Sequence, residues 1–138
     1  MLTPRRLVWI LVTVLGTPAA LYGLAWAYFA VPSSDDYQHR LVFDAKMWRA
    51  KSADAGDDWP TRLRMVNSLM DRHLLDRRTQ PQVVELLGPA DETSKWRDWD
   101  LAYRLGPERK GLFRIDSEWL VIRLDSSRTV SSYRIVAD

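Results

Sequence analysis

Residues 113–136, FRIDSEWLVIRLDSSRTVSSYRIV, contain two apolar segments that flank a polar turn. Phe113 to Leu124 holds several β-branched and aromatic residues, and Val130 to Val136 has the same character. Between them, Asp125 to Arg128 has the composition of a tight turn. This pattern predicts two antiparallel strands joined by a hairpin.

The elements upstream complete the predicted domain. From Trp99 to Leu105, apolar and polar residues alternate with the period of a half-buried strand. Thr61 to Leu75 carries apolar residues at spacings of three and four, which is typical of a helix. A second helix is expected over 79–87, because Thr79 and Gln82 form a capping-box pattern and Gly88-Pro89 ends the apolar run. The order predicts an α+β domain of two helices packed on a three-stranded antiparallel sheet.

The N-terminal region differs from the rest in composition. Residues 7–31 contain no charged residue, and a run of this length can cross a bilayer as one helix. Arg5 and Arg6 precede the run, whereas Asp35 and Asp36 follow it. The positive-inside rule therefore predicts a single-pass protein of the inner membrane with a cytoplasmic N-terminus and a periplasmic C-terminal domain.

Two alternatives to a membrane anchor remain. Ala25-Trp26-Ala27 resembles a signal-peptidase site, so the domain could be secreted to the periplasm after cleavage near Ala27. However, the apolar run is longer than the about 7–15 residues of a signal peptide's apolar region. The other alternative is a buried helix of a soluble protein. Both leading interpretations export the domain.

We therefore expect four regions. Residues 1–6 form a cytoplasmic N-terminus, and residues 7–31 form a transmembrane helix or signal anchor. Residues 32–58 form a linker and N-terminal wrap, whose apolar part, 41–48, either packs on the domain or continues the membrane helix. Residues 59–138 form the α+β domain.

Charge and cysteine content exclude several classes of function. All 18 acidic residues follow residue 31, as do 18 of the 20 basic ones, so the exported part has no formal net charge. A basic nucleic-acid-binding domain is therefore not expected. The chain has no cysteine, which excludes disulfides, thiolate metal sites and a lipid-modified cysteine.

Several short motifs resemble the SmpA/OmlA (BamE-like) domain family. They are Phe43 with Trp48, Arg64-Met65, the segment from Gln82 to Asp91 with its Leu-Leu-Gly-Pro-x-Asp ending, Tyr103 to Gly106 (Tyr-x-Leu-Gly), and Trp119 to Asp125. The resemblance covers residues 43–136. It implies a small envelope domain with a fold related to β-lactamase-inhibitor protein, which contacts other proteins and performs no catalysis. The chain departs from the family's lipoprotein members, because it lacks the lipid-bearing cysteine and has an apolar N-terminal run instead.

The tryptophans and arginines are the candidate binding residues. Five tryptophans fall in the exported part, which is many for a small core, and tryptophan and arginine are enriched at interface hot spots. We expect Trp96 and Trp99 to face opposite sides if residues 96–105 form one strand. The candidate partner-binding residues are Trp96, Trp99, Arg104, Arg114 and Arg123. The expected partner is another envelope protein; the alternative is anionic lipid or peptidoglycan, bound through a basic sheet face.

No enzyme or metal signature stands out. Asp35 and His39 have helical ligand spacing and Asp36 could be a third ligand, but the preceding Pro32 and two serines favour a solvated linker. Ser126 and Ser127 suit the hairpin turn, and no Gly-x-Ser-x-Gly motif occurs. We expect no catalytic residue, no metal and no cofactor; the oligomeric state is left open.

Overall fold

A computed structural model describes residues 22–23, 26, 34–50, 57–91, 94–109 and 115–138. The chain divides into two compact units, Met1–Ser33 and Ser34–Asp138. Within the described residues, no helix has both the length and the apolar character needed to cross a membrane. The predicted span over residues 7–31 falls almost wholly outside the described residues.

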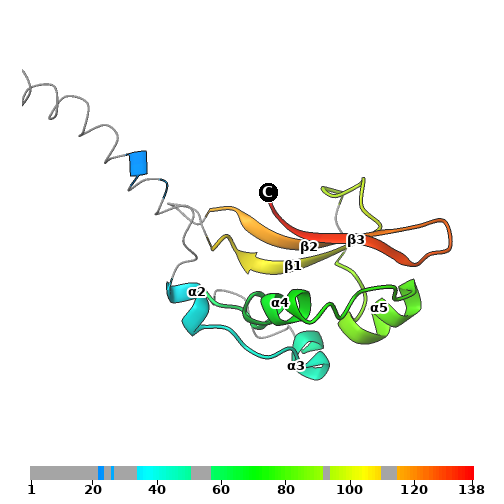
Figure 1. The fold of residues 1–138 in the computed structure, drawn as a ribbon, viewed down its shortest axis with the longest axis horizontal. Helices are drawn as coiled ribbons and strands as arrows, with labels where there is room; N and C mark the ends of the chain where they lie inside the picture. The colour runs from blue at the N-terminus through cyan, green and yellow to red at the C-terminus, as the bar shows by residue number, and fades with distance from the viewer. Residues whose placement is uncertain (1–21, 24–25, 27–33, 51–56, 92–93, 110–114) are drawn as a thin grey trace, which may run out of the picture. The chain divides into compact units, whose positions relative to one another are not determined.

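The second unit contains the predicted three-stranded antiparallel sheet (Figure 1). Its strands are β1 (Leu101–Pro107), β2 (Ser117–Leu124) and β3 (Val130–Ala137), in the order β1-β2-β3. β1 begins two residues later than predicted because 96–99 form a turn, in which the Trp99 amide donates to the Trp96 carbonyl at 3.0 Å.

The two predicted helices are α4 (Thr61–Asp71) and α5 (Gln80–Leu87). The capping box is confirmed, since Thr79 and Gln82 bind each other's backbone. α4 was predicted to reach Leu75 but ends four residues earlier. The cause is local: His73 adopts a positive φ of 51°, which a right-handed helix does not allow.

Two further helices, α2 (Ser34–Gln38) and α3 (Ala45–Arg49), lie in the segment predicted to be a linker and wrap. The alternative that residues 41–48 pack on the domain is the one observed. The Leu41 amide donates to the Arg64 carbonyl at 2.9 Å, and the Phe43 amide donates to Ser68 Oγ at 3.0 Å. Trp48 is fully buried in the core.

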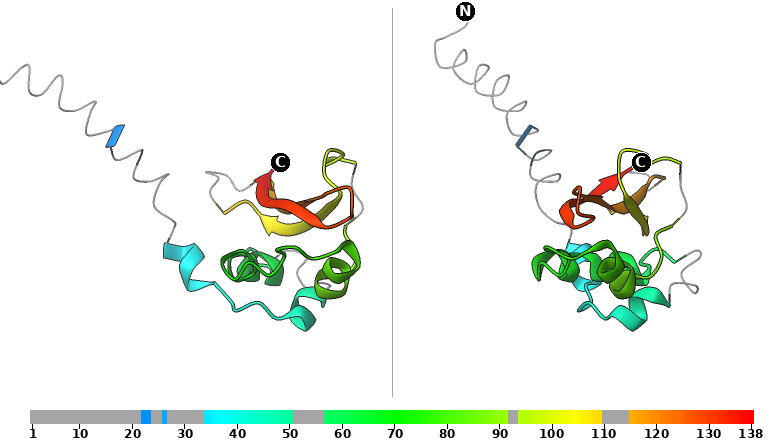
Figure 2. Two further views of the ribbon diagram at one scale, coloured as in Figure 1. Left: turned by 45° about the vertical axis from the view of Figure 1, so that its right-hand side comes forward. Right: turned by 90° about the vertical axis from the view of Figure 1, so that its right-hand side faces the viewer.

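The helices cover one face of the sheet, which we call the inner face (Figures 1 and 2). The main core joins α4 and α5 to the inward side chains of the strands, which include Leu101, Tyr103, Leu105, Leu120, Ile122 and Leu124. Segment 94–100 lies on the opposite, outer face (Figure 2). Among the described residues, the helices therefore lie on the inner face, and segment 94–100 packs on the outer face.

Candidate functional site

Segment 94–100 packs its aromatic side chains on the outer face of the sheet. Trp96 and Trp99 contact a small apolar cluster of Ala102, Trp119 and Val121. The Trp96 ring meets the Trp119 ring edge to face, with centroids 6.5 Å apart and planes at 62°. Both tryptophans therefore pack on the same face, and the prediction that they face opposite sides does not apply. Its condition failed, because residues 96–99 form a turn instead of a strand.

The tryptophans of the second unit contribute to its packing. Trp48 and Trp119 are buried, while Trp59, Trp96 and Trp99 are half-buried. All five indoles therefore contribute to holding the domain together.

Two arginines lie against the Trp99 ring. The Cζ atoms of Arg123, on β2, and Arg134, on β3, are 4.7 Å and 4.9 Å from its centroid. These distances are within cation–π range. Arg123 also donates to the Asp98 carbonyl at 3.0 Å. The ring and the two guanidinium groups thus form one exposed cationic and aromatic surface.

Arg104, on β1, belongs to the same side of the sheet. It is exposed and donates to Ser117 Oγ at 3.1 Å. We define the outer sheet face by Trp96, Trp99, Arg104, Arg123 and Arg134. It brings together four of the five residues predicted as binding candidates; the fifth, Arg114, lies outside the described residues.

Arg134 was not among the predicted candidates. The sequence offers one signal, the alternation of Arg134 with Ser132 and Val136 along the last strand. The position of Arg134 opposite Val121 comes from the strand register of the structure. Among the described residues, no carboxylate lies within 4 Å of the guanidinium group of Arg104, Arg123 or Arg134. Their charges are therefore available to an external anion.

Other charged groups form networks inside the domain. The first network connects the Leu-Leu-Gly-Pro-x-Asp motif at residues 86–91 with the Tyr-x-Leu-Gly motif at residues 103–106. Arg62, only 4% exposed, binds Asp91 at 2.8 Å and lies 5.5 Å from the Trp48 ring. Asp91 also accepts the Arg104 amide at 2.8 Å. Burial raises the pKa of Tyr103, whose hydroxyl donates to the carbonyl of Gly88, to about 12.

A second network attaches α2 to the sheet. Arg109 binds Glu118 at 2.7 Å and Asp36 at 2.9 Å, and all three side chains are largely buried. Burial alone would raise the pKa of Asp36, but the hydrogen bonds and charges of Arg40 and Arg109 outweigh it and hold that pKa below its usual range. Burial opposes the charge of Arg109, yet Glu118 and Asp36 raise its pKa. Both networks stabilise the fold.

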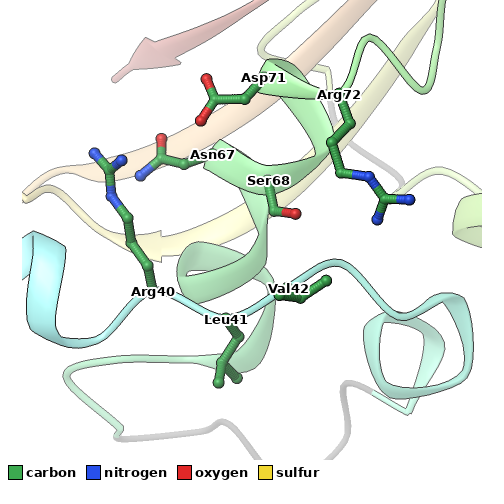
Figure 3. Close-up of a pocket in the computed structure, with 7 residues that line it drawn as sticks. All are labelled: Arg40, Leu41, Val42, Asn67, Ser68, Asp71 and Arg72. Carbon is green, nitrogen blue, oxygen red and sulfur yellow. The ribbon is translucent and has the colours of Figure 1, made fainter.

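A pocket of about 330 Å³ lies between the chain at 40–42 and α4 (Figure 3). Two of its polar groups are bound within the domain: Arg40 pairs with Asp36, and Ser68 Oγ accepts the Phe43 amide. Figure 3 shows Arg72 directed away from Arg40 and Asn67, so the lining groups do not converge on one point. This arrangement does not meet the geometry of a nucleophile, base and oxyanion site.

The residues weighed as metal ligands have other partners in the structure. His39 stacks on Trp59 with ring centroids 4.3 Å apart and planes at 4°, and Asp36 pairs with arginines. In the part of the chain that the structure describes, no three His, Asp or Glu side chains are grouped as metal ligands. Ser127 takes the expected turn role, since its amide and hydroxyl both donate to Asp125.

Comparisons with protein-family models, with curated proteins and with solved structures find no match to this chain.

Proposed function

We propose that this chain is a membrane-anchored binding module of the bacterial envelope, without catalytic activity. Residues 7–31 anchor it in the inner membrane, and the α+β domain lies in the periplasm. The domain binds another envelope protein through the outer sheet face. The anchor keeps the domain close to membrane-bound partners, which raises their effective concentration and makes a modest interface sufficient.

The observation that carries the proposal is the contrast between two sets of arginines. Arg62 and Arg109 are buried and paired with carboxylates. Arg123 and Arg134 are exposed beside Trp99, with no carboxylate partner among the described residues. Such a tryptophan–arginine cluster is typical of interface hot spots.

The resemblance to the SmpA/OmlA domain supports the same conclusion, and we propose membership on the contacts of its motifs. The Tyr103 hydroxyl donates to the Gly88 carbonyl at 2.9 Å, and the Asp91 amide donates to the Ala102 carbonyl at 2.9 Å. These contacts give the two motifs a structural reason to occur together. They fix the end of α5 against β1.

Photo-crosslinking in intact cells tests the proposal. A photo-reactive amino acid replaces Ser132, which is exposed beside Arg134 and is not itself part of the cluster. We expect one dominant envelope protein among the adducts. The matched control carries the same group at Arg72, which is exposed on the helical side, and should not give that adduct. A lack of any adduct specific to position 132 would contradict the proposal.

Salt separates the protein partner from the alternative, anionic lipid or peptidoglycan. Adhesion by charge alone should be lost in about 1 M salt, where the Debye length is about 3 Å. A partner held also by packing on Trp99 should persist. Topology is tested with a reporter enzyme that is active only outside the cytoplasm, fused after Asp138; activity is expected, and an inactive fusion would invert the assigned topology.

A further inference from the structure

The two edges of the sheet differ in what covers them. β1 forms one edge and β3 forms the other, because β2 lies between them. The edge of β1 is occupied by the chain that follows α5. The Asp91 amide donates to the Ala102 carbonyl, and the Asp91 carboxylate accepts the Arg104 amide. Arg62 also donates to the Arg104 carbonyl at 3.3 Å.

The backbone hydrogen bonds of β2 show which amides and carbonyls of β3 point away from the sheet. The Ile122 carbonyl and the Leu124 amide bind Asp100, on the β1 side of β2. In an antiparallel ladder these directions alternate, so Trp119, Val121 and Arg123 of β2 bond toward β3. Their register partners on β3 are Val136, Arg134 and Ser132.

From Tyr133 onward, the other residues of β3 therefore direct their amides and carbonyls away from the sheet. They are Tyr133, Ile135 and Ala137. The start of the strand is covered, because the Val130 amide donates to the Arg78 carbonyl at 2.8 Å. Beyond it, none of these three residues has a backbone partner among the described residues. An open edge of this kind is a template for another strand.

The side chains next to this edge select the partner. On the outer face the edge carries Ser132 and Arg134, with Arg123 one strand further in. On the inner face it carries the half-buried Tyr133 and Ile135. A fourth strand would therefore place alternate side chains beside arginines and beside apolar groups.

A second copy of this chain fits poorly. Pairing two β3 strands antiparallel about Tyr133, Arg134 or Ile135 brings the two Arg134 side chains opposite or diagonal to each other. Like charges at these positions are unfavourable. A carboxylate in the same position would instead pair with Arg134, which has no acidic partner among the described residues.

We propose that the edge of β3 binds an extended segment of the partner protein, in which acidic residues alternate with apolar ones. The added strand bonds to the outward amides and carbonyls of Tyr133, Ile135 and Ala137. Its acidic side chains lie on the outer face beside Arg134 and Arg123. This inference rests on the proposed function and assigns the chemistry of the partner's binding segment.

A defined peptide tests the proposal without knowledge of the partner. The probe is about as long as β3, with glutamate alternating with valine; its counterpart has lysine in place of glutamate. Both are added to the full chain in non-ionic detergent micelles, and amide hydrogen exchange is measured residue by residue. We expect the acidic peptide to slow exchange at Tyr133, Ile135 and Ala137 by at least about tenfold, and the lysine peptide to leave it unchanged.

Charge reversal supplies the matched variant. Arg134→Glu should weaken the acidic peptide by about five- to tenfold, in line with cross-strand charge pairs, and should allow the lysine peptide to bind. Arg72→Glu, on the other side of the domain, should change neither. Absence of protection at these amides with both peptides, or equal protection by both, would overturn the proposal.

The two proposals can fail separately. The peptide could protect the β3 edge while position 132 gives no specific adduct in cells. The proposed envelope function would then be rejected, and the proposal that β3 binds an acidic strand would be retained. Conversely, a partner could be crosslinked at position 132 although saturating acidic peptide does not prevent the partner from binding. Strand addition at β3 would then be rejected, and the proposed function would be retained.

Discussion

Replacing Asp91 with alanine is expected to lower the free energy of unfolding by about 3 kcal/mol. The side chain is the carboxylate partner of Arg62, whose side chain is only 5% exposed, at 2.8 Å. Removing one member of a buried pair costs about 3–5 kcal/mol, because the other charge stays buried. The lower end applies here, since Asp91 is itself 17% exposed and Arg62 keeps its bond to the Arg104 carbonyl.

A double-mutant cycle isolates the pair. Arg62→Met removes the buried charge while keeping much of the side-chain volume, so it should cost only about 1–2 kcal/mol. The double variant should be no less stable than Asp91→Ala alone, which corresponds to a coupling of about 1–2 kcal/mol. Asp98→Ala is the control; its side chain is exposed, and a change within about 0.5 kcal/mol is expected.

Urea unfolding of the full chain in non-ionic detergent, followed by tryptophan fluorescence, measures these energies. With a slope of about 1–3 kcal/mol per molar, Asp91→Ala should lower the midpoint by about 1–3 M. Two results would contradict a stabilising Arg62–Asp91 pair: a loss below about 1 kcal/mol for Asp91→Ala, or strict additivity of the two substitutions.

Three further outcomes are expected. The pKa of Asp36 lies below 3.8 in the folded protein, so this carboxylate stabilises the fold fully above about pH 5 and loses that effect as the pH falls through its native pKa. Asp36→Asn should therefore reduce the loss of stability at acidic pH in a plot of unfolding free energy against pH. An unchanged loss would contradict this. Gly106→Ala should cost about 1–3 kcal/mol by urea unfolding, since φ is 155° and a Cβ would lie 2.8 Å from Pro60 Cγ; wild-type stability would contradict that geometry. Burial, reinforced by Asp76, raises the pKa of Tyr133 to about 12, so Asp76→Asn should lower that pKa in an alkaline absorbance titration read against Tyr133→Phe.

Local patterns were sufficient for the sheet and for the positions of the two main helices. Alternation over 99–105 and the turn at Asp125 each specify structure within a few residues, and the capping box at Thr79 specifies a helix start. The end of α4 was mispredicted because apolar spacing continues through Leu74, whereas the positive φ at His73 is not encoded by any local glycine.

The candidate site was predictable in its residue types but not in its arrangement. Trp96 was assigned to a strand because apolar residues alternate there, whereas a turn carries both Trp96 and Trp99 across the outer face. Arg134 could be connected with Trp99 only once the β2–β3 register was known. Pairing between distant segments, such as Asp36 with Arg109, likewise depends on tertiary contacts that periodicity does not report.

Quantitative co-purification from solubilised membranes measures whether the outer sheet face binds a partner. The tagged full chain is compared with the Arg123→Glu, Arg134→Glu double variant and with a control in which Lys46 and Arg72, both exposed on the helical side, are replaced by glutamate. We expect one envelope protein to be recovered with the wild type and with the control. The double variant should stay folded, and the amount of that protein recovered with it should fall at least about tenfold. Equal recovery with all three proteins would contradict a partner-binding role for the outer sheet face.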